Sequence, residues 1–288
     1  MKSHRRRNLR GLAGMLLLCA GAALPAAYAQ PAAETKPAIP DFSTNKLWVL
    51  MNGTAYFRVP GDAGPGPIMQ KGKEYKHDDV PRIADTSNPI LKPWAKKLMD
   101  INNDRVIEGG IPFYTTSRCW PGGVPGLLLY PGEPVQFVQT PKEVWIMWQR
   151  DQQVRRVYLD VPHSAKPHYS VYGESVGHYE NGDTLVVDTI GLDASVPIDR
   201  FRTPHTPQLH VVERFRMENG GKNVEVSFTV EDPGAFNMPW KGKVDFEPGR
   251  GTRSGRWEES ICADGPTDYF ADSRPDTVPI PRADKPDF

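Results

Sequence analysis

The segment VYGESVGHYENGDTLVVDTIG, residues 171–191, decides the fold that we expect for this chain. Asn181-Gly182 is a two-residue turn signal, because a type I′ turn needs positive φ at both central positions. Residues that strands favour follow the turn, namely Thr184, Val186, Val187, Thr189 and Ile190. The segment therefore predicts a β-hairpin in which Glu180 pairs with Asp183.

This register sorts the side chains of the hairpin by face. It places Gly173, Ser175 and Gly177 on one face of the first strand, opposite Asp188 of the second. Small residues within a strand often mark the close approach of a ligand or of another backbone. We therefore predict a ligand groove with the carboxylate of Asp188 at its centre. In the alternative, a bulky side chain from elsewhere fills the groove, and Asp188 bonds Ser175 or a loop amide.

Short strand patterns continue on both sides of the hairpin. They cover residues 46–51, 127–130, 135–139, 143–149, 154–161, 171–179, 184–190, 209–217, 224–230, 243–246 and 256–262. Such spacing predicts an all-β fold, an antiparallel meander that closes into a lipocalin-like β-barrel or a sandwich. Residues 93–105 have helical spacing behind an initial proline, so we expect one N-terminal helix that ends at Gly109-Gly110.

The N-terminus has the parts of a secretory signal peptide. Basic residues between positions 2 and 10 precede an apolar core, and Ala27-Tyr28-Ala29 fits the cleavage rule. We expect 1–29 to be a signal peptide and 30–87 an extended segment with one strand and a loop. Residues 88–264 then form the barrel domain with its leading helix, and 265–288 form a Pro-rich tail. The expected location is the periplasm.

Charge and cysteine content bound the partners. Removing residues 1–29 takes away five of the 35 Lys and Arg residues and none of the 35 Asp and Glu residues, which leaves a charge of −5. This argues against nucleic acid and anionic membrane surfaces as partners, and no later segment is apolar enough to span a bilayer. Two cysteines remain, and we predict a Cys119–Cys262 disulfide because exported proteins often pair them. The alternative is two buried free thiols.

The segment 209–230 places a carboxylate in an apolar row. In its second strand, Val224, Val226, Phe228 and Val230 alternate with polar residues, so one face belongs to the core. The partner strand puts Glu213 among apolar residues. A carboxylate there must be paired or have a raised pKa, and raised carboxylates serve as general acids or bases. Glu213 is therefore either catalytic or part of a buried ion pair with an arginine.

Histidines are concentrated in one region, at His163, His168, His178, His205 and His210. His163 follows a strand and His205 lies in a Pro-bounded loop, where catalytic groups are often placed. Convergence with Asp188 or Glu213 would make an acid–base or a metal site. The histidine spacing does not favour metal, and we expect no cofactor. The predicted catalytic set is His163, His178, Asp188, His205 and Glu213.

Aromatic residues are plentiful around the predicted mouth of the barrel, at Trp120, Trp145, Trp148, Tyr158, Tyr172, Phe236 and Trp240. An aromatic lining suits an apolar or aromatic ligand, although such residues also build ordinary cores. Arginines at 118, 155 and 156 can bind a carboxylate or a phenolate, or serve as surface charges. The predicted substrate-binding residues are Arg118, Tyr158, Tyr172, Ser175 and Trp148.

Several motifs occur together along residues 88–265. They are RCxPG (118–122), RRVYLD…H (155–163), GESVGHYENGDTLVVDTIG (173–191), D…PHT…LHVVERF (199–215), EDPGAF (231–236) and ExxxCxxG (258–265). This set resembles an uncharacterised family of secreted, β-rich proteins of proteobacteria and acidobacteria. The resemblance implies export and a β-rich fold but no established reaction. By analogy with other enzymes of bacteria that degrade lignin-derived aromatics, it suggests a cofactor-free lyase. Members often carry Trp where Tyr179 stands and Gly-Arg in place of Val161-Pro162.

These observations predict a periplasmic small-molecule enzyme whose barrel interior binds an apolar or aromatic substrate. A general base takes a proton while a paired acid donates to the leaving group, which is lyase-type chemistry. Three other functions stay open: a non-catalytic ligand-binding protein with apolar walls, a metal-dependent hydrolase, and an envelope interaction module that exposes an apolar patch instead of a pocket.

Overall fold

Strands dominate the described part of this computed structural model, which covers residues 39–43, 47–51, 56–62, 64–72, 83–110, 119–129, 134–249 and 257–262. All of these residues belong to one unit, Pro37–Phe288. The expected signal peptide, the tail 265–288 and Arg118 lie outside the described residues.

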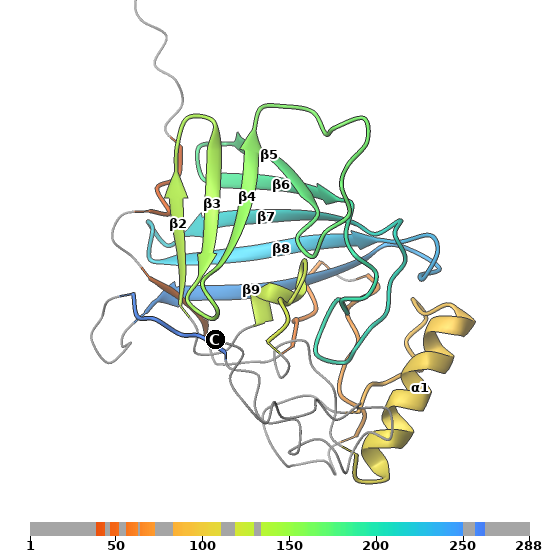
Figure 1. Ribbon diagram of the computed structural model, residues 1–288. Coiled ribbons are helices and arrows are strands. Elements are labelled where there is room, and N and C mark those ends of the chain that lie inside the picture. The colour runs from red at the N-terminus through yellow and green to blue at the C-terminus, as the bar shows by residue number, and fades with distance from the viewer. Residues whose placement is uncertain are drawn as a thin grey trace, which may run out of the picture. The chain divides into compact units, whose positions relative to one another are not determined.

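Nine strands of the described residues close into one barrel (Figure 1). Each pairs with the next along the chain, and β1 closes the barrel by pairing with β9. The predicted all-β barrel with one N-terminal helix is therefore confirmed. The strands are β1 (Trp48–Leu50), β2 (Val135–Gln139), β3 (Glu143–Trp148), β4 (Gln153–Leu159), β5 (Glu174–Glu180), β6 (Thr184–Ile190), β7 (His210–Glu218), β8 (Asn223–Glu231) and β9 (Trp240–Pro248).

One strand pair departs from the predicted antiparallel meander. β4 and β5 run parallel and share only the pairs from Val157↔Ser175 to Leu159↔Gly177. Parallel neighbours need a crossover of about a dozen residues or more, and residues 160–173 supply it. This crossover carries His163 to the start of β5.

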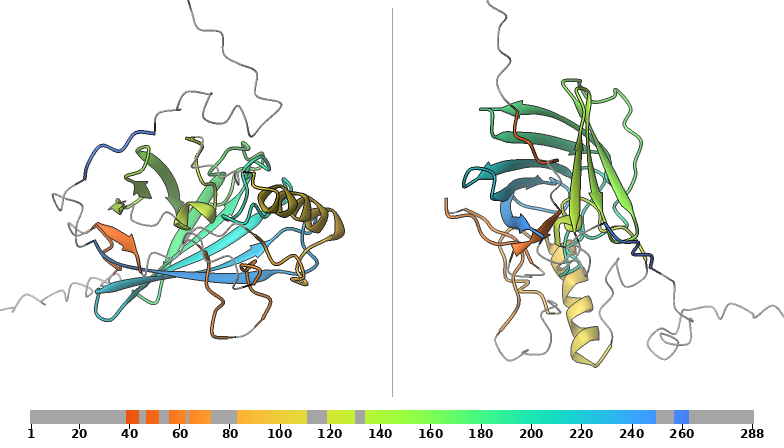
Figure 2. Two further views of the ribbon diagram at one scale, coloured as in Figure 1. Left: turned by 90° about the horizontal axis from the view of Figure 1, so that it is seen from below. Right: turned by 90° about the vertical axis from the view of Figure 1, so that its left-hand side faces the viewer.

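The core lies between two layers of strands. Figures 1 and 2 show β2–β4 crossing the long strands β5–β9 on the other side of the barrel. Bulky fully buried side chains occupy the interior and its ends, among them Trp48, Trp148, Trp240, Phe57 and Phe215. The alternation in β8 is as predicted, because Val224, Val226, Phe228 and Val230 are all buried. The interior face is thus built of side chains that the two-residue period identifies.

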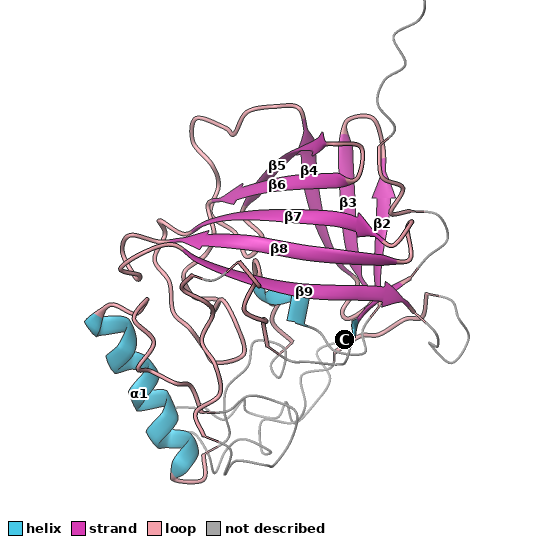
Figure 3. Cartoon of the chain, turned by 180° about the vertical axis from the view of Figure 1, so that it is seen from behind, coloured by secondary structure: helices cyan, strands magenta, loops and turns pink. Residues whose placement is uncertain are grey.

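The helix α1 (Pro93–Ile107) lies beyond one end of the strands (Figure 3). It extends two residues past the predicted helical range 93–105, and Gly109 follows its C-cap with φ of 93°. The strand predictions for residues 127–130 and 256–262 are wrong. Gly126–Leu129 form a 3₁₀-helix, and described residues 257–262 contain only an isolated bridge from Ser260 to Arg150.

A disulfide joins Cys119 to Cys262, as predicted, with Cα atoms 5.4 Å apart. It closes a segment of 143 residues that contains most of the barrel. Among the described residues, no helix combines the length and apolarity that a bilayer crossing needs.

Candidate acid–base site

The hairpin at 174–190 forms with a register one residue away from the predicted one. Asn181 and Gly182 have φ of 54° and 74°, as the turn signal requires, but Glu180 pairs with Thr184. Asp183 is left out of the β5–β6 ladder, and its carbonyl accepts the Met217 N–H of β7 at 2.9 Å. A shift of one residue turns side chains to the other face.

The predicted groove opposite Asp188 is therefore wrong. Asp188 pairs with Val176 and points outward, while Ser175 and Gly177 face inward. A Cβ on Gly177 would lie 2.6 Å from the Val186 carbonyl oxygen, so glycine is needed for close packing there. The bulky side chain beside Ser175 is Arg155 of β4, whose Nε donates to the Ser175 hydroxyl at 3.0 Å. The alternative is therefore right about a bulky side chain beside Ser175, but Asp188 bonds His163 and His210 instead of Ser175 or a loop amide.

Glu213 belongs to a buried ion pair. Its carboxylate lies 2.5 Å from Arg155 Nη2, with side-chain exposures of 0 % and 1 %. Arg155 also donates to Thr189 Oγ1 at 2.7 Å. Ser175 directly follows Glu174 in sequence, and Thr189 directly follows Asp188. Through these two hydroxyls, the Arg155–Glu213 pair holds from the inside the strand positions whose outer faces carry Glu174 and Asp188.

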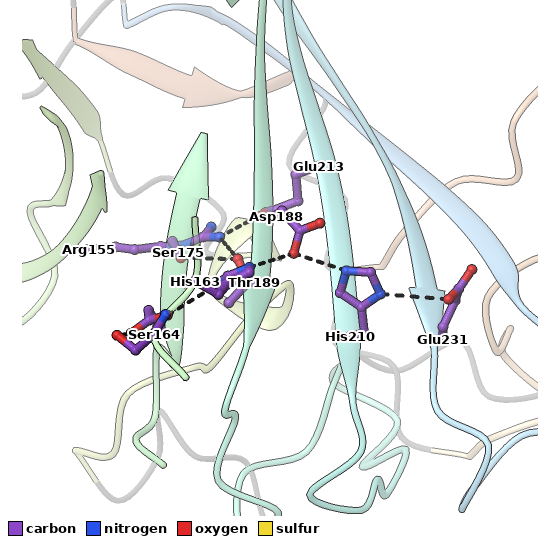
Figure 4. A network of polar contacts seen from close by, with 10 residues as sticks. Arg155, His163, Ser164, Ser175, Asp188, Thr189, His210, Glu213 and Glu231 are labelled. Carbon is purple, nitrogen blue, oxygen red and sulfur yellow. Dashed lines mark hydrogen bonds and ion pairs between the residues drawn. The ribbon is translucent and has the colours of Figure 1, made fainter. Parts of the chain in front are cut away.

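The site itself is a row of imidazoles and carboxylates on the outer face of the barrel (Figure 4). Asp188 Oδ1 lies 2.9 Å from His163 Nε2 and 3.0 Å from His210 Nε2. His163 Nδ1 lies 3.0 Å from Glu174, and His210 Nδ1 lies 3.6 Å from Glu231. The row therefore crosses from β5 to β8, with the crossover loop supplying His163.

Hydrogen bonds from the 163–164 segment anchor the β5 end of this row. The backbone N–H of Ser164 donates to Glu174 at 2.7 Å and its hydroxyl at 2.5 Å. These bonds, with a smaller contribution from His163, hold the pKa of Glu174 below its ordinary value. Glu174 is thus an ionised acceptor that orients the His163 ring.

Two opposing effects set the charge of Asp188. Partial burial raises the pKa of the carboxyl, but the hydrogen bonds from His210 and His163 outweigh burial and leave the pKa below its ordinary value. The hydrogen bond to Asp188 in turn raises the pKa of His210, and nearby Glu231 adds to the effect. Asp188 is therefore an anion whose oxygen accepts a proton-bearing nitrogen from each side.

The two imidazoles differ in their hydrogen bonds. His163 has a carboxylate on each ring nitrogen, so both nitrogens donate when the ring is an imidazolium. His210 donates Nε2–H to Asp188, which leaves Nδ1 facing Glu231 beyond hydrogen-bond distance. With 34 % of its side chain exposed, His210 is the ring of the pair that can exchange a proton with a bound molecule.

The remaining predicted catalytic residues lie elsewhere. His178 points outward on β5, half exposed, and contacts Glu180 at 3.0 Å. His205 is buried, with its ring nitrogens 2.9 Å from the carbonyl oxygens of Thr206 and Val196. With Glu213 inside the barrel, only His163 and Asp188 of the predicted five come together.

Three predicted substrate-binding residues line one cavity of about 320 Å³ where β4 and β5 diverge, namely Tyr158, Tyr172 and Ser175. Tyr158 faces outward against the Arg156 guanidinium, 5.3 Å from its ring centre. Trp148 is not at a mouth, because it is buried in the core at 1 % exposure. Glu174 also lines the cavity, so this hollow adjoins the β5 end of the row.

Sequence reasoning missed three members of the row: Glu174, His210 and Glu231. His210 was one of the five clustered histidines but was not part of the predicted catalytic set. The missing signal was the strand register, because Asp188 pairs with Val176 of β5 and Val212 of β7, which places it on the same outward face as Glu174 and His210.

Fold and site define the chain as a closed β-barrel with an outward His–Asp–His cluster. Within the described residues, no group of three or more His, Cys, Asp or Glu side chains is arranged to hold a metal ion. No protein-family model matches the chain, and a search of curated proteins finds no relative.

Proposed function

We propose that this protein is an enzyme that performs cofactor-free acid–base chemistry on a small apolar or aromatic molecule. The supporting observation is that one carboxylate oxygen of Asp188 accepts both His163 and His210, while Nδ1 of His210 faces Glu231 at the longer distance of 3.6 Å. A carboxylate on one ring nitrogen fixes the tautomer and stabilises the imidazolium that forms when the other nitrogen takes a proton.

His210 Nδ1 is then the general base. It takes a proton from carbon or oxygen of the substrate, and the resulting positive charge lies between Asp188 and Glu231. The raised pKa of His210 reflects this stabilisation, first by Asp188. His163 does not touch the substrate in this scheme. It is a positioning residue, held by Glu174, that keeps Asp188 aimed at His210.

A lyase reaction fits these groups. His210 removes a proton next to an electron-withdrawing group, the electron pair forms a new double bond, and the leaving oxygen departs with a proton from water. A well-placed acid or base contributes about 10²–10⁴-fold to the rate. The Cys119–Cys262 disulfide supports the further proposal that the chain works in an oxidising compartment, the periplasm.

The test is turnover of a panel of small phenolic and arylpropane compounds in D₂O, followed by mass spectrometry for loss of water or formaldehyde and for deuterium uptake. We expect His210→Gln and Asp188→Asn to lower turnover about 10²-fold or more. The matched control is His178→Gln, an exposed histidine on β5 with one carboxylate contact, which keeps full turnover.

Two outcomes contradict the proposal. Compounds that bind without any turnover favour a carrier protein instead. Turnover that is lost on treatment with a chelator and returns with Zn²⁺ favours the metal-dependent hydrolase.

A further inference from the structure

A cavity of about 340 Å³ adjoins the β8 end of the row. Glu231, whose carboxylate lies 3.6 Å from His210 Nδ1, is part of its lining. Lys92 and a group of apolar residues complete most of the wall, namely Pro233, Phe236, Met238 and Pro239. This volume lies in the lower part of the range for small-molecule sites.

Hydrogen bonds between distant parts of the chain build this wall. The backbone N–H of Lys92 donates to the Ala235 carbonyl at 3.0 Å. The Trp94 indole N–H donates to the Gly234 carbonyl at 2.8 Å. Phe236 is buried edge-on against Trp240, with ring centres 5.9 Å apart. The segment before α1 and the β8–β9 link are thus joined, and the cavity is preformed rather than a gap between loose loops.

Lys92 brings a positive charge to this cavity. Its ammonium contacts the carbonyl oxygen of Pro233, which uses one of three N–H donors. Among the described residues, no carboxylate lies within ion-pair distance of it. The side chain is only half-buried, so a ligand can reach the remaining donors.

The other large hollow differs in this respect. A groove of about 660 Å³ on the outer face of β7–β9 contains several basic side chains. Each of them already pairs with a carboxylate: Arg214 with Glu180, Arg216 and Lys243 with Glu225, and Lys241 with Asp62. The cavity beside Glu231 therefore differs in having a lysine, Lys92, that no described carboxylate pairs with.

Asp232 also lines the cavity, but its charge is used within the protein. Its two oxygens accept from the Thr206 N–H and hydroxyl, and from the N–H groups of Gly234 and Ala235. Glu231 is the more open acid, with 49 % of its side chain exposed.

We propose that this cavity binds a small organic acid whose body is about one ring in size. The ligand carboxylate takes the free N–H donors of Lys92, and its apolar body packs on Pro233, Met238 and Pro239. Its far end then lies toward Glu231 and Nδ1 of His210. That this acid is also the substrate rests on the proposed function. That it binds in the cavity is independent of the proposed function.

Benzoate and benzamide test the charge requirement, because the two molecules share a ring and differ in charge. Methyl signals of methionine, followed by NMR during titration, report the site. We expect benzoate to bind with a dissociation constant of about 1 mM and benzamide at least about tenfold more weakly. The Met238 methyl signal shifts, and that of Met69, a methionine of similar exposure outside the cavity, does not.

Variants separate the binding site from the acid–base row. Lys92→Met weakens benzoate binding about tenfold and abolishes the preference over benzamide, while Lys97→Met on the exposed side of α1 changes neither. Asp188→Asn keeps benzoate affinity and loses turnover. Equal binding of the two probes, a silent Met238 signal, or full affinity in Lys92→Met overturns the proposal. Benzoate binding at Lys92 without turnover of any acid overturns only the enzyme proposal.

Discussion

Replacing Glu213 by Gln tests the interior support of the site. The variant keeps the shape of the side chain but leaves the Arg155 guanidinium buried at 1 % exposure without its counter-charge. Breaking a buried ion pair in this way costs about 3–5 kcal/mol, a large part of a total stability of about 5–15 kcal/mol. For a chain of this size, the midpoint of thermal unfolding should fall by about 6–20 °C.

The assay is urea unfolding followed by tryptophan fluorescence, with the slope m compared between variants. The control is Glu180→Gln, which removes a half-exposed ion pair with Arg214 and should cost less than about 1 kcal/mol. The double variant Arg155→Met/Glu213→Leu removes both charges and should recover most of the loss. A cost below about 1 kcal/mol for Glu213→Gln, or a double variant as unstable as the single one, refutes the reasoning.

Three other changes have defined outcomes. Asp188→Asn should lower the stability by about 0.5–1 kcal/mol between pH 3.8 and pH 6.5, the ordinary pKa values of Asp188 and His210. The lowered pKa of Asp188 stabilises the fold above pH 3.8, and the raised pKa of His210 stabilises it below pH 6.5. The loss of stability in the variant should therefore be smaller at pH 9 and at pH 2, which urea unfolding at each pH measures. Cys119→Ser with Cys262→Ser should remove about 2–5 kcal/mol, and reductant should no longer change the melting point. Gly177→Ala should cost about 1–3 kcal/mol, because its methyl group would lie too close to a β6 carbonyl. A variant whose midpoint of thermal unfolding equals that of the wild type would contradict this.

The strands were predictable where side chains alternate strictly. β6 has the expected bounds, and β8 buries the expected valines and Phe228, because a two-residue period reports one core face directly. The segment 127–130 has no such alternation, and its apolar run becomes a 3₁₀-helix. The parallel pairing of β4 and β5 depends on a long crossover, which local pattern does not specify.

The site was predictable only in part, because its geometry depends on the register of three strand pairs. Positive φ at Asn181 and Gly182 fits a two-residue turn, yet Glu180 pairs with Thr184, and Asp183 bonds Met217 of β7 through its carbonyl. Residues beyond the hairpin therefore choose the face on which Asp188 lies. The ion pair of Glu213 was foreseen only as the alternative to a catalytic role, on the ground that an isolated carboxylate in an apolar row requires a counter-charge.

The most direct measurement is the NMR titration of the His210 ring nitrogens in the wild-type protein and in Asp188→Asn. If Asp188 couples the two imidazoles into one acid–base unit, His210 titrates above its ordinary value of 6.5 in the wild type and falls toward that value in the variant, with His178 unchanged between the two. Identical His210 titration curves in both proteins would contradict the account.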